Sequence, residues 1–471
     1  MANLMMATTH EPTAAPAIFR FVNSFARELQ GFYVPQRPAI VFEPRLLFLN
    51  DSLAEELDLD LTSFNATARA AIFAGNTLPE GAEPLAQAYA GHKFGGFSPQ
   101  LGDGRALVLG EVIDRQGRRR DIAFKGCGRT PFARGGDGKA AVGPMLREVL
   151  IGESMHALGI PTTRALAVAA TGEQVYRQRV LPGAVLTRVA ASHIRVGTFE
   201  FCASHGGVER VRKLAEYTIA RHDPALVTTP QPFLALLQNV AERQAALVAQ
   251  WMNVSFIHGV MNTDNMTISG DTIDYGPCAF MEAYDPATVF SSIDHQGRYA
   301  FGNQPDIACW NLARLAETLL PLLSDDPRRS IAMAREVIAA FPAQFRKNLR
   351  TAHQARAASS RTGRRQPRCC AGRRLVEFAS CRAGRFHPRV AATRGRRRRR
   401  GATACAVRRC ARARCMAGPL ESPLRHGKRQ RTARLSNGRS RACQGDAQRQ
   451  SKRDPPQPSR GRGTGCCVRR R

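Results

Sequence analysis

The feature that most constrains this sequence is an abrupt change in composition near residue 350. Residues 351–471 hold 35 of the 69 Lys and Arg residues but only 4 of the 38 Asp and Glu residues, which leaves 34 of each sign in residues 1–350. The formal net charge of +31 therefore belongs entirely to the end of the chain. Because a basic surface indicates function only through its position, any nucleic-acid binding would have to reside in this basic tail.

The basic tail (residues 351–471) has a composition that cannot bury a core. It loses helical and strand periodicity after about Ala352, and it contains two aromatic residues, the run Arg396–Arg400 and nine of the thirteen cysteines. Consecutive arginines can bind the phosphate backbone of RNA or DNA, which is one interpretation. We favour out-of-frame translation of a GC-rich gene, because a selected basic tail would rarely carry nine cysteines or avoid lysine. We expect the tail to be disordered.

The cysteines of residues 1–350 indicate a reducing compartment. Cys127, Cys202, Cys278 and Cys309 are scattered without metal-ligand spacing, as buried free thiols are in cytosolic proteins. The N-terminus lacks a basic segment followed by a long apolar run, and no stretch reaches the roughly 18 apolar residues of a membrane span. We therefore expect a cytoplasmic protein that is neither secreted nor inserted into a membrane.

The periodicity of residues 1–350 predicts an α+β fold. Strand-like runs at Arg105–Ile113 and Asp121–Lys125 flank a turn and predict a β-hairpin, and apolar residues at helical spacing predict a helix over Val142–Leu158. The remaining expected elements are a helix at Asn50–Leu59, strands at Arg164–Ala169 and Ala184–Val189, a helix at Pro232–Met252 and a short hairpin over Met266–Asp274. This order is typical of a protein kinase-like fold with a β-rich N-lobe and a helical C-lobe.

Composition and element order together divide the chain into four segments. We predict an N-terminal extension packed on the lobes at 1–83, a kinase-like N-lobe with the nucleotide-binding motifs at 84–200, a helical C-lobe at 201–350 and the tail at 351–471. The change at residue 350 predicts that the C-lobe is incomplete.

The first half of the chain supplies the groups that phosphate chemistry needs. Transfer from ATP requires a cation on the phosphates, oxygen ligands for magnesium and a glycine-rich cover. The glycines of Gln100–Arg105 let the backbone approach a ligand closely. Lys125 ends a strand, and Glu148 lies in the middle of the following helix, as in the kinase ion pair. Taken alone, the two residues would be better explained as two solvated side chains.

A second cluster, His258–Asn265, is followed by Asp274 and resembles a kinase catalytic loop with one departure. Asn265 stands five residues after Val260, so valine occupies the usual base position, although Asn265 and Asp274 fit magnesium ligands. Asp264 is the only carboxylate left in the loop that could deprotonate a hydroxyl. A polar loop with Asx turns is the alternative explanation.

Together these motifs resemble the selenoprotein O family over about Phe21 to Phe345. The motifs that carry the resemblance are Pro84–Gly95, Gln100–Arg105, Lys125–Gly128, Gly135–Gly138, Gly159–Leu166, Leu186–Arg188, Ser192–Glu200 and His258–Asn265. Several long motifs in the family's order make the resemblance specific.

The resemblance implies a pseudokinase-like protein adenylyltransferase, which binds ATP in the reverse orientation and transfers AMP to Ser, Thr or Tyr hydroxyls of proteins. It implies Mg²⁺, or Mn²⁺, held by Asn265 and Asp274, with Asp264 as the proton acceptor. The residues that would contact the nucleotide are Gly102, Gly104, Arg105, Lys125, Asp137, Gly138, Arg188, Arg195 and Asp274. Several arginines and a lysine suit a triphosphate whose terminal phosphate points inward.

One departure from the family bears on regulation, and two alternative functions stay open. Some family members carry a cysteine in the segment after Asp-x-Gly, but here Val289–Asp294 has none, so redox control is not expected. A phosphotransferase that resembles small-molecule kinases would use the same ATP site, although Val260 argues against it. An inactive ATP-binding remnant with a tail that binds nucleic acid non-specifically is the third alternative.

Overall fold

The computed structural model describes residues 18–362. Contacts divide the chain into two compact units, Met1–Ala391 and Ala392–Arg471, and the described residues all belong to the first. The predicted disorder of the tail is wrong for residues 351–362, which continue a long helix. The rest of that prediction, from residue 363 onward, lies outside the described residues.

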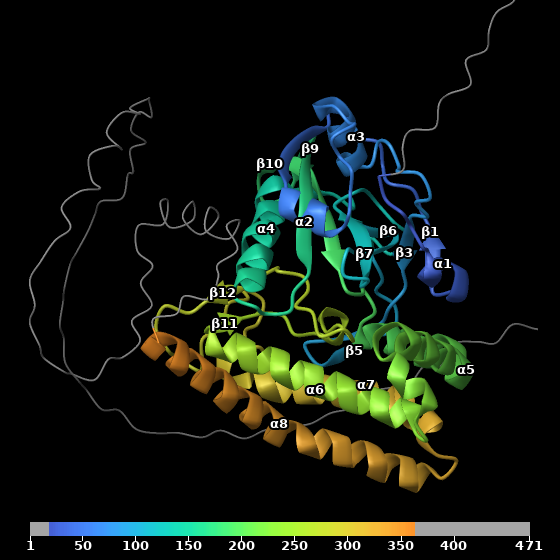
Figure 1. The fold of residues 1–471 in the computed structure, drawn as a ribbon, viewed down its shortest axis with the longest axis vertical. Coiled ribbons are helices and arrows are strands. Elements are labelled where there is room, and N and C mark those ends of the chain that lie inside the picture. Colours follow the sequence, from blue (N-terminus) through green and yellow to red (C-terminus); the bar gives the residue numbers. More distant parts are fainter. Residues whose placement is uncertain (1–17, 363–471) are drawn as a thin grey trace, which may run out of the picture. The chain divides into compact units, whose positions relative to one another are not determined.

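One lobe is built on an eight-stranded antiparallel sheet, counted over residues 18–362 (Figure 1). The strand order is β1-β3-β6-β7-β10-β9-β2, and β8 pairs with β10. The strands are β1 (Tyr33–Pro35), β2 (Arg45–Leu49), β3 (Leu85–Gln87), β6 (Ala106–Ile113), β7 (Arg119–Lys125), β8 (Ala140–Ala141), β9 (Arg164–Tyr176) and β10 (Val180–Ala190). Both edge strands, β1 and β2, come from the first fifty residues.

The predicted hairpin is confirmed as β6 and β7. Leu107 faces Phe124 and Val108 faces Ala123 in the register, and these apolar side chains are buried. Strands β9 and β10 are longer than predicted, because only the buried halves, at residues 164–169 and 184–189, have the continuous apolar run of a buried strand. Their outer halves, around Tyr176 and Val180, are largely exposed and lack that run, so periodicity did not predict them.

Helices form the other lobe and cover part of the sheet. Figure 1 shows α5 to α8 gathered apart from the eight-stranded sheet, whereas α4 packs against β9 and β10 through Met145 and Val149. The predicted helices at α2, α4 and α6 are confirmed. The helices are α1 (Ser24–Glu28), α2 (Asp51–Glu56), α3 (Ala66–Ala74), α4 (Val142–Ala157), α5 (Val196–His222), α6 (Pro232–Asn253), α7 (Gln304–Leu323) and α8 (Pro327–Thr362).

Short elements occupy the connections between these helices and strands. They are the 3₁₀ helices η1 (Pro224–Thr228), η2 (Thr263–Asn265) and η3 (Phe301–Asn303) and the two-stranded pairs β4 (Gly91–Lys93) with β5 (Gly96–Ser98) and β11 (Phe256–Ile257) with β12 (Ala279–Phe280).

The hairpin predicted over Met266–Asp274 is wrong in its partners. Thr267 pairs with Arg195, and Thr272 pairs with Thr162. Buried backbone N–H and C=O groups need hydrogen-bond partners, and two other chain segments supply them here, one on each side of the loop. The loop therefore ties the start of α5 to the start of β9.

A buried ion cluster joins the sheet to α5. Asp121 of β7 accepts hydrogen bonds from Arg221 at 2.5 Å and from the ring of His193 at 2.9 Å. Glu111 of β6 lies 3.6 Å from Arg221 and accepts a hydrogen bond from the backbone of Ser24 at 2.8 Å. Burial by itself raises the pKa of Asp121, but Arg221 and His193 outweigh it and lower that pKa.

The cysteines of the described residues are free, as expected from the sequence. Cys127, Cys202 and Cys278 are buried, and burial raises the pKa of each thiol. None of the helices within residues 18–362 combines the length and apolar character needed to cross a lipid bilayer.

Candidate active site

A cavity of about 490 Å³ contains nearly all residues singled out in the sequence. Lys125 reaches it from β7, Arg188 from β10, Glu148 from α4 and Asp274 from the loop after η2. The sequence-predicted residues that line it are Gly102, Gly104, Arg105, Lys125, Asp137, Gly138, Glu148, Arg188, Arg195, Asn265 and Asp274. Asp264 is the exception, since it does not line this cavity.

Lys125 is the centre of the charged groups. Its ammonium nitrogen lies 2.5 Å from a carboxylate oxygen of Glu148 and 2.5 Å from Oδ1 of Asp274. The same oxygen of Asp274 accepts a hydrogen bond from Arg188 at 2.8 Å. The strand lysine and helix glutamate of a kinase are therefore brought together, and they are linked to the residue expected to bind metal.

Asp274 is ionised in this environment. Burial alone would raise its pKa, but Lys125, Arg188 and Arg195 together lower it well below its ordinary value. The backbone of Asp274 is left-handed, with φ of 61°, a conformation that Asp adopts more readily than most residues. The site thus holds a carboxylate in its charged form at the end of the cavity.

Arg195 is a buried cation with unused donors. Its side chain is 1% exposed, lies 3.5 Å from Asp103 and stacks over the ring of Tyr89 at 4.3 Å. Within residues 18–362, its Nε and Nη1 have no hydrogen-bond partner, and neither has Nε of Arg188. Buried donors left unpaired are costly, so this end of the cavity is suited to an anion with several oxygens.

Two glycines shape the wall of the cavity. Gly102 has φ of +84°, and a Cβ there would lie 2.3 Å from the ring of Phe132. Gly138 has φ of +70°, and its Cβ would lie 2.1 Å from the backbone of Gly128. Only glycine fits both positions, because each is packed closely against another part of the chain. The approach of this backbone to a nucleotide stays a prediction.

Asp137 lines the cavity, but its carboxylate is paired. Arg177 donates to its two oxygens at 2.7 and 2.9 Å. This bidentate contact, with Lys139 nearby, lowers the pKa of Asp137 to about 2. Sequence reasoning missed Arg177, because it lies in the turn between β9 and β10, 40 residues away.

Asp264 and Asn265 lie in η2, beside the cavity. Asn265 donates to the carbonyl of Val260 at 3.0 Å, which leaves its amide oxygen as an acceptor. Asp264 packs against Gly91, and its Oδ1 has no hydrogen-bond partner among the described residues. Burial raises the pKa of Asp264 to about 6, although Arg195 acts in the opposite direction. A carboxyl with this pKa is suited to accept a proton near neutral pH.

Tyr89 and Asp103 also belong to the site, although they were not singled out beforehand. Both lie within recognised motifs, and both contact Arg195. The sequence did contain a signal for Asp103, because this residue stands between the two glycines of its motif. Its contact with Arg195 could not be predicted from residue spacing, because the two residues are far apart in the sequence.

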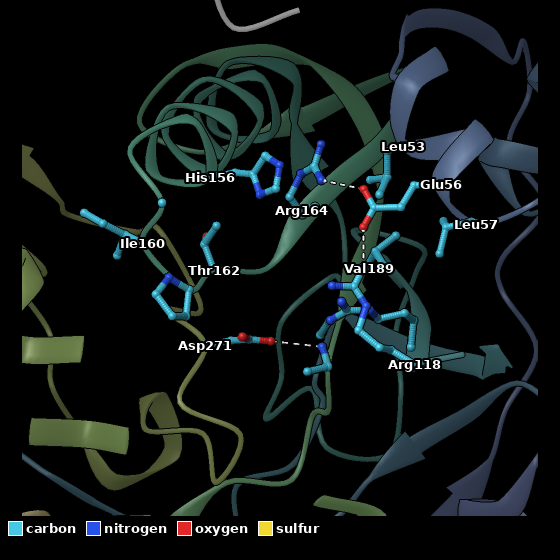
Figure 2. Close-up of a pocket in the computed structure, with 15 residues that line it drawn as sticks. Leu53, Glu56, Leu57, Arg118, His156, Ile160, Thr162, Arg164, Val189 and Asp271 are labelled. Atoms are coloured by element: carbon cyan, nitrogen blue, oxygen red, sulfur yellow. Dashed lines mark hydrogen bonds and ion pairs between the residues drawn. The ribbon is translucent and has the colours of Figure 1, made fainter. Parts of the chain in front are cut away.

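A second cavity, of about 340 Å³, contains none of the predicted site residues (Figure 2). Its charged groups mainly neutralise one another. Glu56 accepts from Arg118 at 2.8 Å and from Arg164 at 3.3 Å, and Asp271 accepts from the backbone of Ala191 at 2.9 Å. We therefore assign nucleotide chemistry to the larger cavity.

The oxygen donors of the larger cavity fit a hard divalent cation. Asn265 offers an amide oxygen and Asp274 a charged carboxylate, and magnesium in nucleotide sites is commonly held by one or two such groups together with phosphate oxygens. The described residues contain no cluster of three or more His, Cys, Asp or Glu side chains that could hold a metal ion. A metal here would therefore depend on the nucleotide for further ligands.

The fold and the cavity define a kinase-like nucleotide-binding enzyme. A family model described as "Protein adenylyltransferase SelO" matches residues 18–368. The chain belongs to this SelO family.

Curated relatives agree with this assignment. A "Protein nucleotidyltransferase YdiU" of Cereibacter sphaeroides is 67% identical over 328 residues, which is 69% of this chain and 68% of the relative. Proteins of the same name from Rhizobium etli and Rhizobium leguminosarum bv. trifolii are 62% and 61% identical over 340 residues, covering 72% of this chain and 68% of each relative.

Proposed function

We propose that this chain transfers AMP from ATP to Ser, Thr or Tyr hydroxyls of proteins. The observation that carries the proposal is the convergence of Lys125, Arg188 and Arg195 on Asp274, while valine stands at the kinase base position. These cations can hold the terminal phosphates inside the cavity and leave the α-phosphate toward the acceptor.

The remaining predicted residues have defined roles in this proposal. Gly102, Gly104 and Gly138 let the backbone approach the nucleotide, Arg105 adds positive charge, and Glu148 orients Lys125. Asp137 would act by holding Arg177 in place. If ATP displaces that ion pair, Asp137 would contact the nucleotide itself.

Asn265 and Asp274 would hold the divalent cation, Mg²⁺ or Mn²⁺, which neutralises phosphate charge when bound. In the transfer step, the acceptor oxygen forms a bond to the α-phosphorus and the bond to the β-phosphate oxygen breaks, so that pyrophosphate leaves. Asp264 receives the hydroxyl proton. Its carboxylate oxygen without a hydrogen-bond partner is free for that role among the described groups.

We place the protein in the cytoplasm, where its buried free thiols would remain reduced. Its partners in this proposal are ATP and hydroxyl-bearing proteins.

Labelled ATP tests the reaction directly. With Mg²⁺ and protein acceptors, label at the α-phosphate should be transferred and label at the γ-phosphate should not. Mass spectrometry should find AMP on a hydroxyl side chain, and Asp264→Ala should abolish it. Transfer of the γ-label alone would instead identify a phosphotransferase, and transfer of neither label an inactive ATP-binding remnant.

A further inference from the structure

A closed hydrogen-bond network involves Thr263, the residue that precedes Asp264. Glu200, in the first turns of α5, is 4% exposed, and both of its carboxylate oxygens are used. One oxygen lies 2.5 Å from Nδ1 of His92, and the other accepts from the hydroxyl of Thr263 at 2.5 Å. The Thr263 hydroxyl oxygen in turn accepts from the backbone N–H of His92 at 2.7 Å. Three side chains from three distant segments are thereby joined.

This network fixes the turn that carries Asp264. Thr263 begins η2, and Asp264 is the next residue. On the opposite side of Thr263, Asn262 accepts from the Tyr299 hydroxyl at 2.6 Å and from the backbone of Phe94 at 3.3 Å. Hydrogen bonds from the β4–β5 hairpin therefore hold Asn262 and Thr263, whereas Oδ1 of Asp264 has no hydrogen-bond partner among the described residues.

Two glycines allow the surrounding backbone to pack closely against Asp264. A Cβ on Gly91 would lie 2.9 Å from Oδ1 of Asp264, and a Cβ on Gly197 would lie 3.3 Å from its Cα. Gly197 also accepts a hydrogen bond from the backbone of Ala90 at 2.9 Å. The backbone of β4 and that of the first turn of α5 therefore pack closely against Asp264.

The same end of α5 reaches the nucleotide cavity. Arg195 is the residue that precedes the helix, and Glu200 lies five residues further on. A helix is stiff over this distance, so Glu200 relates the position of the η2 turn to that of Arg195.

We propose that Glu200 is a positioning residue for AMP transfer. Through Thr263 and His92 it holds Asp264 at a fixed place relative to the cations that bind the phosphates. The inference rests on the proposed role of Asp264. Displacement of a reacting group by about 1 Å can cost on the order of 100-fold in rate, so the network should affect turnover more than nucleotide affinity.

Substitutions at Thr263 test this in the full-length protein. Thr263→Val keeps the shape of the side chain and removes the hydroxyl, whereas Thr263→Ser keeps the hydroxyl. Thr318→Val is a matched control, because Thr318 is a buried threonine whose hydroxyl donates to Leu315 in α7. The measurements are kcat and KM for AMP transfer to an acceptor protein, Kd for Mg-ATP and the melting temperature.

We expect Thr263→Val and Glu200→Gln to lower kcat by about 10- to 100-fold, with Kd for Mg-ATP within about twofold of the parent. Thr263→Ser and Thr318→Val should stay near parental kcat. In an Asp264→Asn background, Thr263→Val should cause no further loss, because the residue being positioned is already disabled.

Other results would overturn the inference. Equal losses in Thr263→Ser and Thr263→Val, a parallel fall in nucleotide affinity, or a full additional loss in the Asp264→Asn background would make the network merely structural. If Asp264→Asn abolishes transfer but Thr263→Val keeps the parental kcat, this inference fails alone. If Asp264→Asn transfers AMP like the parent, or the parent transfers none, the proposed function fails with it.

Discussion

Lys125 and Asp274 are joined by a contact of 2.5 Å between the ammonium nitrogen and a carboxylate oxygen. The contact links β7 of the sheet to the loop that follows η2. With Arg188 on the same oxygen, the carboxylate is surrounded by positive charge before any nucleotide binds. The charged groups of the two lobes are therefore preorganised for a bound nucleotide.

Asp274→Ala should weaken Mg-dependent ATP binding at least tenfold, since metal sites lose about 10- to 100-fold in affinity even when supporting groups are removed. Calorimetric titration with Mg-ATP measures this. Asp325→Ala, at an exposed position, is the control and should leave affinity unchanged. Parental affinity in Asp274→Ala would mean that the metal site is misassigned.

Glu148→Gln should reduce AMP transfer by about 10- to 100-fold, because Lys125 loses the charged partner that orients it and keeps an ion pair with Asp274 alone. Steady-state kinetics with α-labelled ATP tests this. Glu153→Gln is the matched control on the same helix, where Glu153 pairs with Arg164 at 2.8 Å. Equal activities of the two variants would argue against a role for the ion pair in catalysis.

Gly138→Ala should be more damaging than Gly135→Ala. Both glycines have positive φ, so each substitution costs about 1–2 kcal/mol of stability. Only at Gly138 would the new Cβ meet backbone atoms, at 2.1 Å, whereas Gly135 has no atom within 4 Å. Thermal unfolding should show the larger loss of stability for Gly138→Ala, and ATP titration should show weaker binding for Gly138→Ala alone.

Asp121→Asn should destabilise the protein by roughly 3–5 kcal/mol at neutral pH, because it leaves the buried Arg221 without a full partner. The pKa of Asp121 is lowered below its ordinary value of 3.8, so the unfolded chain binds its proton first as the pH falls. Its stabilising contribution is therefore complete above about pH 4 and is lost on further acidification. Denaturant unfolding between pH 6 and pH 3 should show a shallower decline for Asp121→Asn than for Asp325→Asn.

A chain ending after Thr362 should bind Mg-ATP within about twofold of the full chain, because all candidate site residues precede that point. Loss of ATP binding would contradict this. A salt titration of RNA binding with both proteins tests the remaining alternative, since phosphate contacts made by arginines weaken steeply with salt. RNA binding by the full chain alone would assign that property to residues 363–471.

Local patterns were sufficient to predict β6, β7, α4 and α6, because alternation and helical spacing are properties of neighbouring residues. They could not predict the pairing partners of Thr267 and Thr272, which are set by chain segments 72 and 110 residues away. For the cavity, the motifs identified the residues but not their contacts. His92, Glu200 and Thr263 lie within the recognised motifs, yet their network joins positions 63 to 171 residues apart and leaves no periodic trace.

The edge position of β2 has a consequence for biosynthesis. Phe48 of β2 pairs with Val168 of β9, so the strand has no partner until about 120 more residues have been made. At typical synthesis rates of about 5–20 residues per second, β2 waits roughly 6 to 24 seconds after its own synthesis. During that interval its apolar residues, including Leu46 and Leu49, are an unpaired strand accessible to chaperones. The sheet can close only after the segment that supplies Arg188 and Arg195 begins to emerge, which makes the nucleotide cavity one of the last parts of this lobe to form.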